Sequence, residues 1–99
     1  LFRSSKPVML DFWAEWCVSC KELDNFTFTD PAVISELSKY TLLKADVTHN
    51  TADDKALMKK FNVFGPPALI FYDKDGNLEK SKRIVGYKPA KEFLEIITK

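Results

Sequence analysis

DFWAEWCVSCKELD, residues 11–24, contains both cysteines of this 99-residue chain, Cys17 and Cys20, with two residues between them. Two tryptophans stand just before the cysteines, and an acid, Asp11, stands in a run of apolar residues. Cysteines at this spacing can form a structural disulfide, supply half of a metal site, or react as a thiol pair. The choice among these three uses decides the fold and the chemistry that we expect.

The residues on either side of the pair predict a strand followed by a helix. Residues 7–13, PVMLDFW, form a nearly continuous apolar run, which is typical of a strand buried on both faces. A helix is predicted to begin at about Cys17 and to break near residues 25–31, NFTFTDP. Asp30 can cap a second helical segment that has Pro31 at its first position.

The rest of the chain predicts three strands and two helices. A helix over residues 52–61 is expected to bury Leu57 and Phe61, and a last helix is expected to begin near Pro89. The last two strands are joined by a DKDGN turn in which Gly76 can take a positive φ. The predicted strands are residues 40–47, 68–73 and 82–87. This order predicts an α/β fold with a central mixed sheet and helices on both faces.

Length and composition indicate one globular domain, residues 1–99, that we expect to be a monomer. The chain is long enough to bury a core without a disulfide or a metal. Hydrophobic residues make up 45% of it and charged residues 29%, with a formal net charge of +1. Because its 15 basic residues are scattered, we expect no binding to nucleic acid. The longest apolar stretch, residues 64–72, is too short to span a bilayer, so we expect no membrane insertion by this segment.

A structural disulfide and a metal site both fit the cysteine pair poorly. A disulfide stabilises a fold more when it closes a longer loop, and Cys17 and Cys20 close a very short one. Tetrahedral zinc needs two further ligands, and the chain offers only His49 and carboxylates at unrelated spacings. We therefore expect no metal, and no cofactor other than a redox-active disulfide between the two cysteines.

Thiol–disulfide exchange fits the local sequence better. A buried strand ends at Trp13, and a short connection leads into a helix whose first turn carries Cys17. Unpaired backbone N–H groups and the helix dipole stabilise a thiolate at such a position. Cys20, three residues on, faces the same side and can attack a mixed disulfide formed at Cys17. We expect Cys17 to be the exposed nucleophile and Cys20 the resolving thiol.

Two acids near the pair are candidate proton acceptors. Asp11 lies between Leu10 and Phe12 in the buried strand, where an unpaired carboxylate is costly. It is either a satisfied structural acid or the base that takes the proton of Cys20, and we favour the base. Asp24 stands four residues after Cys20, so it can share this task or be a solvated surface acid.

VMLDFWAEWCVSCK resembles the active-site segment of the thioredoxin family, and the whole chain can be laid along that fold. The resemblance implies a redox pair at Cys17 and Cys20, a buried acid at Asp11, and a cis-proline at Pro67. Without it, the two prolines of FGPPA fit a cis turn or an ordinary end of a loop. The implied substrate groove is formed by residues beside the cysteines, by the proline turn and by a glycine: Trp16, Val18, Ser19, Pro66, Pro67 and Gly86.

Within the family, WCVSCKELD, the TFTDP break and ADVTHN are most similar to the C-terminal periplasmic domain of the DsbD proteins, which are transmembrane thiol:disulfide interchange proteins. This resemblance implies a relay that takes electrons from a membrane-embedded domain and passes them to a partner thiol domain. The resemblance also implies that the domain is located on the periplasmic side of a bacterial inner membrane. The chain begins LFRSSKP without Met, so we expect it to be cut from such a longer protein. The alternatives are a free-standing general disulfide reductase, periplasmic or cytoplasmic, and a binding module without turnover.

Two residues depart from the thioredoxin pattern. Pro66 has no backbone N–H, so it can offer only its carbonyl to a bound substrate strand. Ala68 replaces the usual Thr and removes a hydroxyl from the groove. We expect a groove that relies on shape and apolar contact, which suits dedicated partners.

Acids outnumber cations in the residues around the pair, where only Lys21 opposes them. Negative neighbours disfavour a thiolate at Cys17, whereas strong oxidants of this fold stabilise their reduced thiolate. The charges therefore predict a reductant. The acids are Asp11, Glu15, Glu22 and Asp24.

Overall fold

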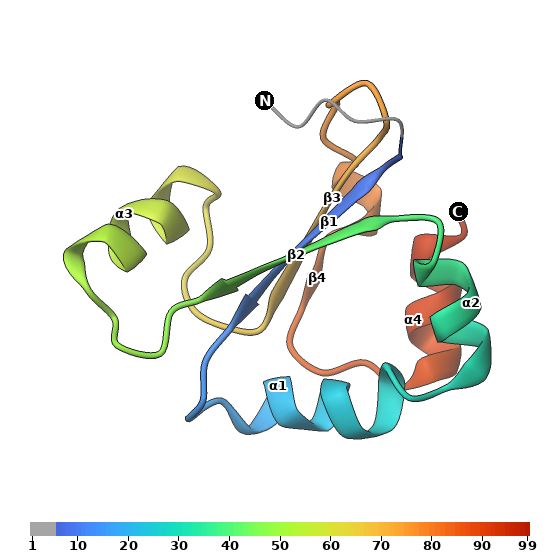
Figure 1. The fold of residues 1–99 in the computed structure, drawn as a ribbon, viewed down its shortest axis with the longest axis horizontal. Coiled ribbons are helices and arrows are strands. Elements are labelled where there is room, and N and C mark those ends of the chain that lie inside the picture. The colour runs from blue at the N-terminus through green and yellow to red at the C-terminus, as the bar shows by residue number, and fades with distance from the viewer. Residues whose placement is uncertain (1–5) are drawn as a thin grey trace.

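The apolar run that precedes the cysteines forms strand β1, Val8–Trp13, inside a four-stranded sheet (Figure 1). The computed structural model describes residues 6–99, and its strand order is β2-β1-β3-β4. β2, Thr41–Asp46, lies parallel to β1, whereas β3, Ala68–Tyr72, runs antiparallel to it. β4, Ile84–Val85, pairs antiparallel with β3, so the sheet is mixed, as predicted.

Helices cover both faces of this sheet, which confirms the predicted architecture. α2, Pro31–Leu37, and α4, Ala90–Ile97, pack on one face, and α3, Ala52–Lys60, lies on the other side (Figure 1). α1, Val18–Glu22, begins beyond the end of β1 and continues directly into a π-helix, η1, Leu23–Thr27. The π-helix and the turn after it are the break that NFTFTDP predicts. None of the helices that the structure describes is long and apolar enough to cross a bilayer.

Local capping signals start two of the helices at the expected residues. The Asp30 carboxylate accepts hydrogen bonds from the backbone N–H groups of Ala32 (2.9 Å) and Val33 (3.3 Å), and Pro31 follows at the first helical position. Thr51 starts α3 with a reciprocal capping box. Because both signals satisfy orphan backbone donors, they begin these helices independently of the core.

Buried side chains form two clusters, one on each face of the sheet. On the face covered by α2 and α4 they are Met9, Leu23, Val33, Leu37, Tyr40, Leu69, Phe71, Ile84, Phe93 and Ile97. On the α3 face they are Leu10, Phe12, Ala14, Cys17, Cys20, Val47, Met58, Val63, Ala68 and Ile70. Side chains alternate along a strand, so Asp11 points to the same face as Met9. The two cysteines pack into the other cluster.

Helix α3 is rotated relative to the prediction. Leu57 is 37% exposed, whereas its neighbour Met58 is buried and Phe61 is partly buried. The prediction that Leu57 is buried is therefore wrong. Residues three apart, such as Met58 and Phe61, share a helical face just as residues four apart do. The apolar pattern alone therefore fits a helix that buries Leu57 and one that buries Met58.

The strand predicted over residues 82–87 is mostly not a strand. Only Ile84–Val85 pair with β3, and Lys80–Lys82 form a 3₁₀-helix, η2. Gly86 has a φ of +85°, in the left-handed region that glycine favours, and it ends the pairing. Gly76 takes the predicted positive φ, at +87°.

Candidate active site at the Cys17–Cys20 disulfide

Cys17 and Cys20 form a disulfide at the start of α1, with their Cα atoms 5.2 Å apart. Cys17 is the N-cap residue, and its Sγ accepts a hydrogen bond from the backbone N–H of Cys20 at 3.1 Å. The same donor can stabilise a thiolate at Cys17 when the pair is reduced. Cys17 is the more accessible of the two, but it is only 6% exposed, against 1% for Cys20. The prediction that Cys17 is exposed is therefore wrong for the oxidised pair, because the disulfide buries both sulfurs, although Cys17 remains the more accessible of the two.

Trp16, next to Cys17 in the chain, is held by the loop within ADVTHN, a contact that the sequence did not predict. Its indole Nε1 donates a hydrogen bond to the Thr48 carbonyl at 2.8 Å, and the Thr48 hydroxyl accepts from the Glu15 N–H at 2.9 Å. Asp46 in turn binds both the N–H and the hydroxyl of Thr48, and these bonds lower the pKa of the Asp46 carboxyl. An Asp two residues before a Thr in ADVTHN is the signal of this turn.

The proline turn lies against the same cluster as the cysteines. The peptide bond between Pro66 and Pro67 is cis, as the resemblance implies. The Pro67 carbonyl accepts a hydrogen bond from the Gly86 N–H at 3.1 Å, which brings two predicted groove residues together. Ala68, next in the chain, packs into the cluster that contains Cys17.

The remaining predicted groove residues, Val18 and Ser19, lie in the first turn of α1. Val18 is 71% exposed and Ser19 is partly buried. With the 59% exposed Trp16, they form an accessible rim beside the nearly covered disulfide.

Asp11 is buried in β1, and burial raises the pKa of its carboxyl to about 7. The nearby Asp24 also raises this pKa, and Lys44 partly opposes the shift. No side chain or backbone group among residues 6–99 forms a hydrogen bond with the Asp11 carboxyl. An acid that titrates near neutral pH without a fixed partner is suited to accept and release a proton.

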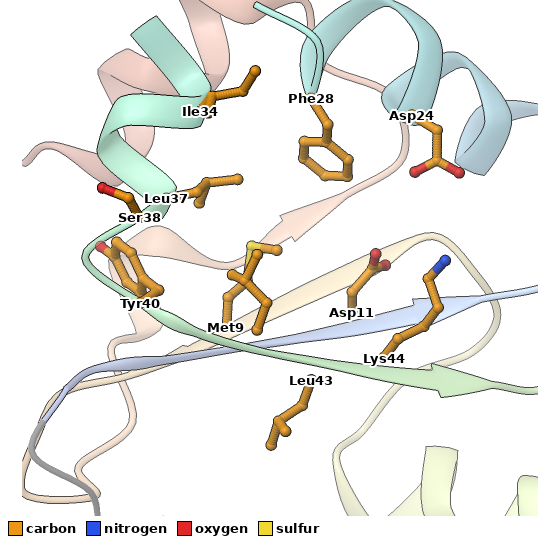
Figure 2. Close-up of a pocket in the computed structure, with 11 residues that line it drawn as sticks. Met9, Asp11, Asp24, Phe28, Ile34, Leu37, Ser38, Tyr40, Leu43 and Lys44 are labelled. Carbon is orange, nitrogen blue, oxygen red and sulfur yellow. The ribbon is translucent and has the colours of Figure 1, made fainter. Parts of the chain in front are cut away.

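Asp24 and Lys44 flank Asp11 at the wall of a pocket of about 480 Å³. Figure 2 shows Asp11 on β1 and Lys44 on β2 pointing toward the helix that carries Asp24. One Asp24 carboxylate oxygen accepts a hydrogen bond from Trp13 Nε1 at 3.1 Å, and Lys44 Nζ lies 4.5 Å from the centre of the Trp13 ring. Asp24 is therefore tied to the tryptophan that precedes the site, and is not simply a solvated surface acid.

Lys44 corrects the predicted charge balance. From the sequence, Lys21 is the one cation expected near the four acids. In the structure, Lys44 also faces Asp11. Lys21 is itself paired with Glu15, at 3.2 Å in an exposed ion pair. Lys44 was missed because it lies far from the cysteines in the sequence and reaches Asp11 only through the pairing of β1 with β2.

Replacing Lys44 is expected to raise the pKa of Asp11 further. In Lys44→Met, a nearby positive charge is lost while the aliphatic stem remains, so the midpoint should rise by about one unit. The carboxyl carbon of Asp11, followed by NMR during a pH titration, measures it directly. Lys60→Met, on the opposite side of the sheet, is the control and should leave the midpoint unchanged. A midpoint that stays the same in Lys44→Met would contradict this electrostatic role.

Residues 6–99 contain no group of three or more His, Cys, Asp or Glu side chains placed to hold a metal ion. The disulfide is contacted by the backbone N–H of Cys20 in the first turn of α1, and the buried acid Asp11 lies on β1 with Asp24 and Lys44 as its charged neighbours.

Known sequences match nearly the whole length of this chain. The sequence profile of the thioredoxin-like domain family matches residues 3–99. The thiol:disulfide interchange protein DsbD of Ralstonia nicotianae is 54% identical over 91 residues, which are 92% of this chain and 15% of that protein. DsbD of Pectobacterium atrosepticum is 47% identical over 93 residues, 94% of this chain and 16% of that protein. The chain thus spans about a sixth of the length of these relatives.

Solved structures show the same fold. The oxidised C-terminal domain of DsbD from Neisseria meningitidis superposes with a TM-score of 0.79 at 36% identity, covering 94% of this chain and 78% of that one. A thioredoxin from Thermus thermophilus superposes with a TM-score of 0.75 at 29% identity, covering 94% and 72%. The match to the family profile along nearly the whole chain, together with this fold and the cysteine pair at the start of α1, places the chain in the family of thioredoxin-like domains.

Proposed function

We propose that the domain is a thiol:disulfide oxidoreductase that acts as a reductant, through a mixed disulfide at Cys17 that Cys20 resolves. The observation that carries this proposal is the Cys17–Cys20 disulfide at the start of α1, with a cis Pro67 turn and the buried acid Asp11 in the same small domain. The similarity to proteins named thiol:disulfide interchange protein supports it.

The reduced pair transfers two electrons in two exchange steps. The Cys17 thiolate attacks one sulfur of the partner disulfide, forms a mixed disulfide and releases the first partner thiolate, which takes a proton. Cys20 gives its proton to Asp11 and attacks the Cys17 sulfur. This second step forms the Cys17–Cys20 disulfide and releases the second partner thiolate, which takes up a proton as Asp11 gives up the one it received from Cys20. The partner gains two electrons and two protons, and the domain ends in the oxidised state.

We place the domain in a longer membrane protein, on the periplasmic side of a bacterial inner membrane. There the oxidised pair is reduced again by a dithiol of a membrane-embedded domain, and the reduced pair passes its electrons to a periplasmic thiol domain. The support is the similarity to DsbD, of which this chain spans about a sixth. No cofactor other than the disulfide takes part.

A single-turnover experiment tests the reductase function. The chain is reduced with dithiothreitol, freed of it, and mixed with one equivalent of a peptide disulfide. We expect one domain disulfide and two peptide thiols per turnover, counted by mass spectrometry after acid quenching. If no peptide thiol is released while the reduced chain remains folded, the domain is a binding module and the proposal fails.

Replacing Pro66 is expected to broaden the substrate range. Pro66→Leu restores a backbone N–H beside the retained Pro67, and one added hydrogen bond of about 1 kcal/mol corresponds to a roughly fivefold gain. Reduction rates with a panel of unrelated peptide disulfides measure this gain. Ala68→Thr, which restores only a hydroxyl, is the matched comparison. Equal rates for Pro66→Leu and the unmodified chain across the panel would remove the support for a groove specialised by its missing donor.

A further inference from the structure

Phe64 is an aromatic side chain that the fold leaves in water. It lies in the loop between α3 and the cis-proline turn and is 99% exposed. It lines two neighbouring pockets, of about 580 and 290 Å³, on the α3 side of the sheet. Val85 and Leu78 line the larger pocket and are 60% and 45% exposed. Large apolar groups gathered in this way mark a surface for contact with another molecule.

The charged side chains that line these two pockets are all cations. Neither pocket has an Asp or Glu in its lining among residues 6–99, although the whole chain has 15 basic and 14 acidic residues. None of these cations forms an ion pair with a carboxylate within those residues. The cations are Lys60, Lys80 and Arg83 in the larger pocket and Lys55 and Lys59 in the smaller one.

Arg83 also fixes the loop that carries Phe64. Its guanidinium donates hydrogen bonds to the carbonyls of Phe61 (3.2 Å) and Asn62 (2.7 Å). These acceptors are neutral, so the positive charge of Arg83 is retained at the surface while the loop is held in place. A surface held in shape loses less entropy when it binds a partner.

The surface adjoins the redox site through the chain. Phe64 stands two residues before Pro66, and Val85 pairs with Ala68, which packs into the cluster of Cys17. A partner segment that contacts the disulfide beside the proline turn can therefore extend over Phe64. We name Phe64, Leu78, Val85 and the five cations the Phe64 surface.

We propose that the Phe64 surface binds an acidic, apolar segment of the redox partner, a segment that lies beside the partner disulfide that the domain reduces. This inference rests on the proposed function. Apolar side chains of the segment cover Phe64 and Val85, and its carboxylates face the cations. Opposite charges steer encounter and fix orientation, and they raise association rates by about 10- to 1000-fold. A second copy of this chain is disfavoured as the occupant, because a symmetric contact would bring like charges together.

Two peptides that carry the same disulfide test this inference. One has leucine and aspartate residues beside the cysteine, and the other has leucine and lysine residues. The second-order rate of their reduction by the reduced chain is measured by stopped flow, at low salt and at about 0.5 M salt, where the screening length is only a few ångströms. We expect the acidic peptide to react about tenfold faster at low salt, and the preference to disappear at high salt.

Variants assign the preference to the surface. Lys60→Glu/Lys80→Glu should abolish or reverse the preference for the acidic peptide. The control, Lys91→Glu/Lys99→Glu, should retain this preference. It makes the same charge change on exposed residues in and after α4, on the other face of the sheet (Figure 1). Phe64→Ser, at a side chain that packs against nothing in the fold, should slow the acidic peptide severalfold at both salt concentrations.

The outcomes separate the two proposals. Equal rates for the two peptides, or equal losses in the two charge variants, would overturn the docking surface and leave the reductase function intact. So would self-association that depends on Phe64. Failure to reduce either peptide would overturn the proposed function itself.

Discussion

Cys20→Ser is expected to accumulate as a covalent mixed disulfide between Cys17 and its substrate, whereas Cys17→Ser should form none. In the first variant the attack at Cys17 still occurs, but no thiol remains to resolve the product. In the second, the remaining thiol is 1% exposed and cannot be reached by a partner disulfide. We expect the rate of disulfide reduction to fall on the order of 1000-fold or more in either variant.

Non-reducing mass spectrometry of each variant, mixed with a peptide disulfide, measures the adduct. The double variant Cys17→Ser/Cys20→Ser is the control for non-specific exchange. An adduct that forms in Cys17→Ser and not in Cys20→Ser would reverse the roles of the two cysteines. We expect Cys17 to be the attacking residue because its Sγ accepts a hydrogen bond from the Cys20 N–H and because it caps α1.

Asp11→Asn is expected to stabilise the fold at pH 8 by roughly 4 kcal/mol, while it slows the resolution of the mixed disulfide. Burial raises the pKa of Asp11 from 3.8 to about 7, so the folded state holds this proton over a range where the unfolded chain has released it. The contribution of Asp11 to the free energy of unfolding is therefore highest below pH 4 and declines as the pH rises to about 7. Above pH 7 the folded state carries a buried charge, and its full energetic cost applies.

Urea unfolding of the oxidised chain at pH 8 and at pH 4 measures this difference. The gain from Asp11→Asn should be large at pH 8 and small at pH 4, because at pH 4 the folded-state carboxyl is neutral and the unfolded-state carboxyl, with its pKa of 3.8, is only partly ionised. Asp24→Asn is the comparison: it keeps an acceptor for Trp13 Nε1 and should shift the pKa of Asp11 downward. An equal effect of Asp11→Asn at both pH values would show that the acid acts through packing and not through its charge.

The parts of the fold predicted from the sequence are those governed by local signals. Asp30 and Thr51 cap helices where side-chain and backbone groups a few residues apart satisfy each other. The continuous apolar run of β1 reflects burial on both faces. The resemblance supplied the cis peptide bond before Pro67, which the prolines alone leave undecided.

The parts that were missed depend on contacts between distant segments. Lys44 reaches Asp11 through the register of two parallel strands, and Thr48 holds Trp16 across a gap of 32 residues. The choice of Met58 over Leu57 for the core depends on how α3 is rotated against the sheet. The exposure of Phe64 likewise follows from tertiary structure, because an aromatic residue before two prolines reads equally well as part of a core.

The midpoint potential of the Cys17–Cys20 pair tests the central claim, that this domain is a reductant. The pair is equilibrated with a thiol–disulfide buffer, and the fraction oxidised is read from the masses of alkylated protein. The acids around the site predict a value near that of thioredoxin, about −270 mV. A value near that of the strong periplasmic oxidants, about −120 mV, would mean that the reduced thiolate is stabilised and that the domain donates disulfides instead.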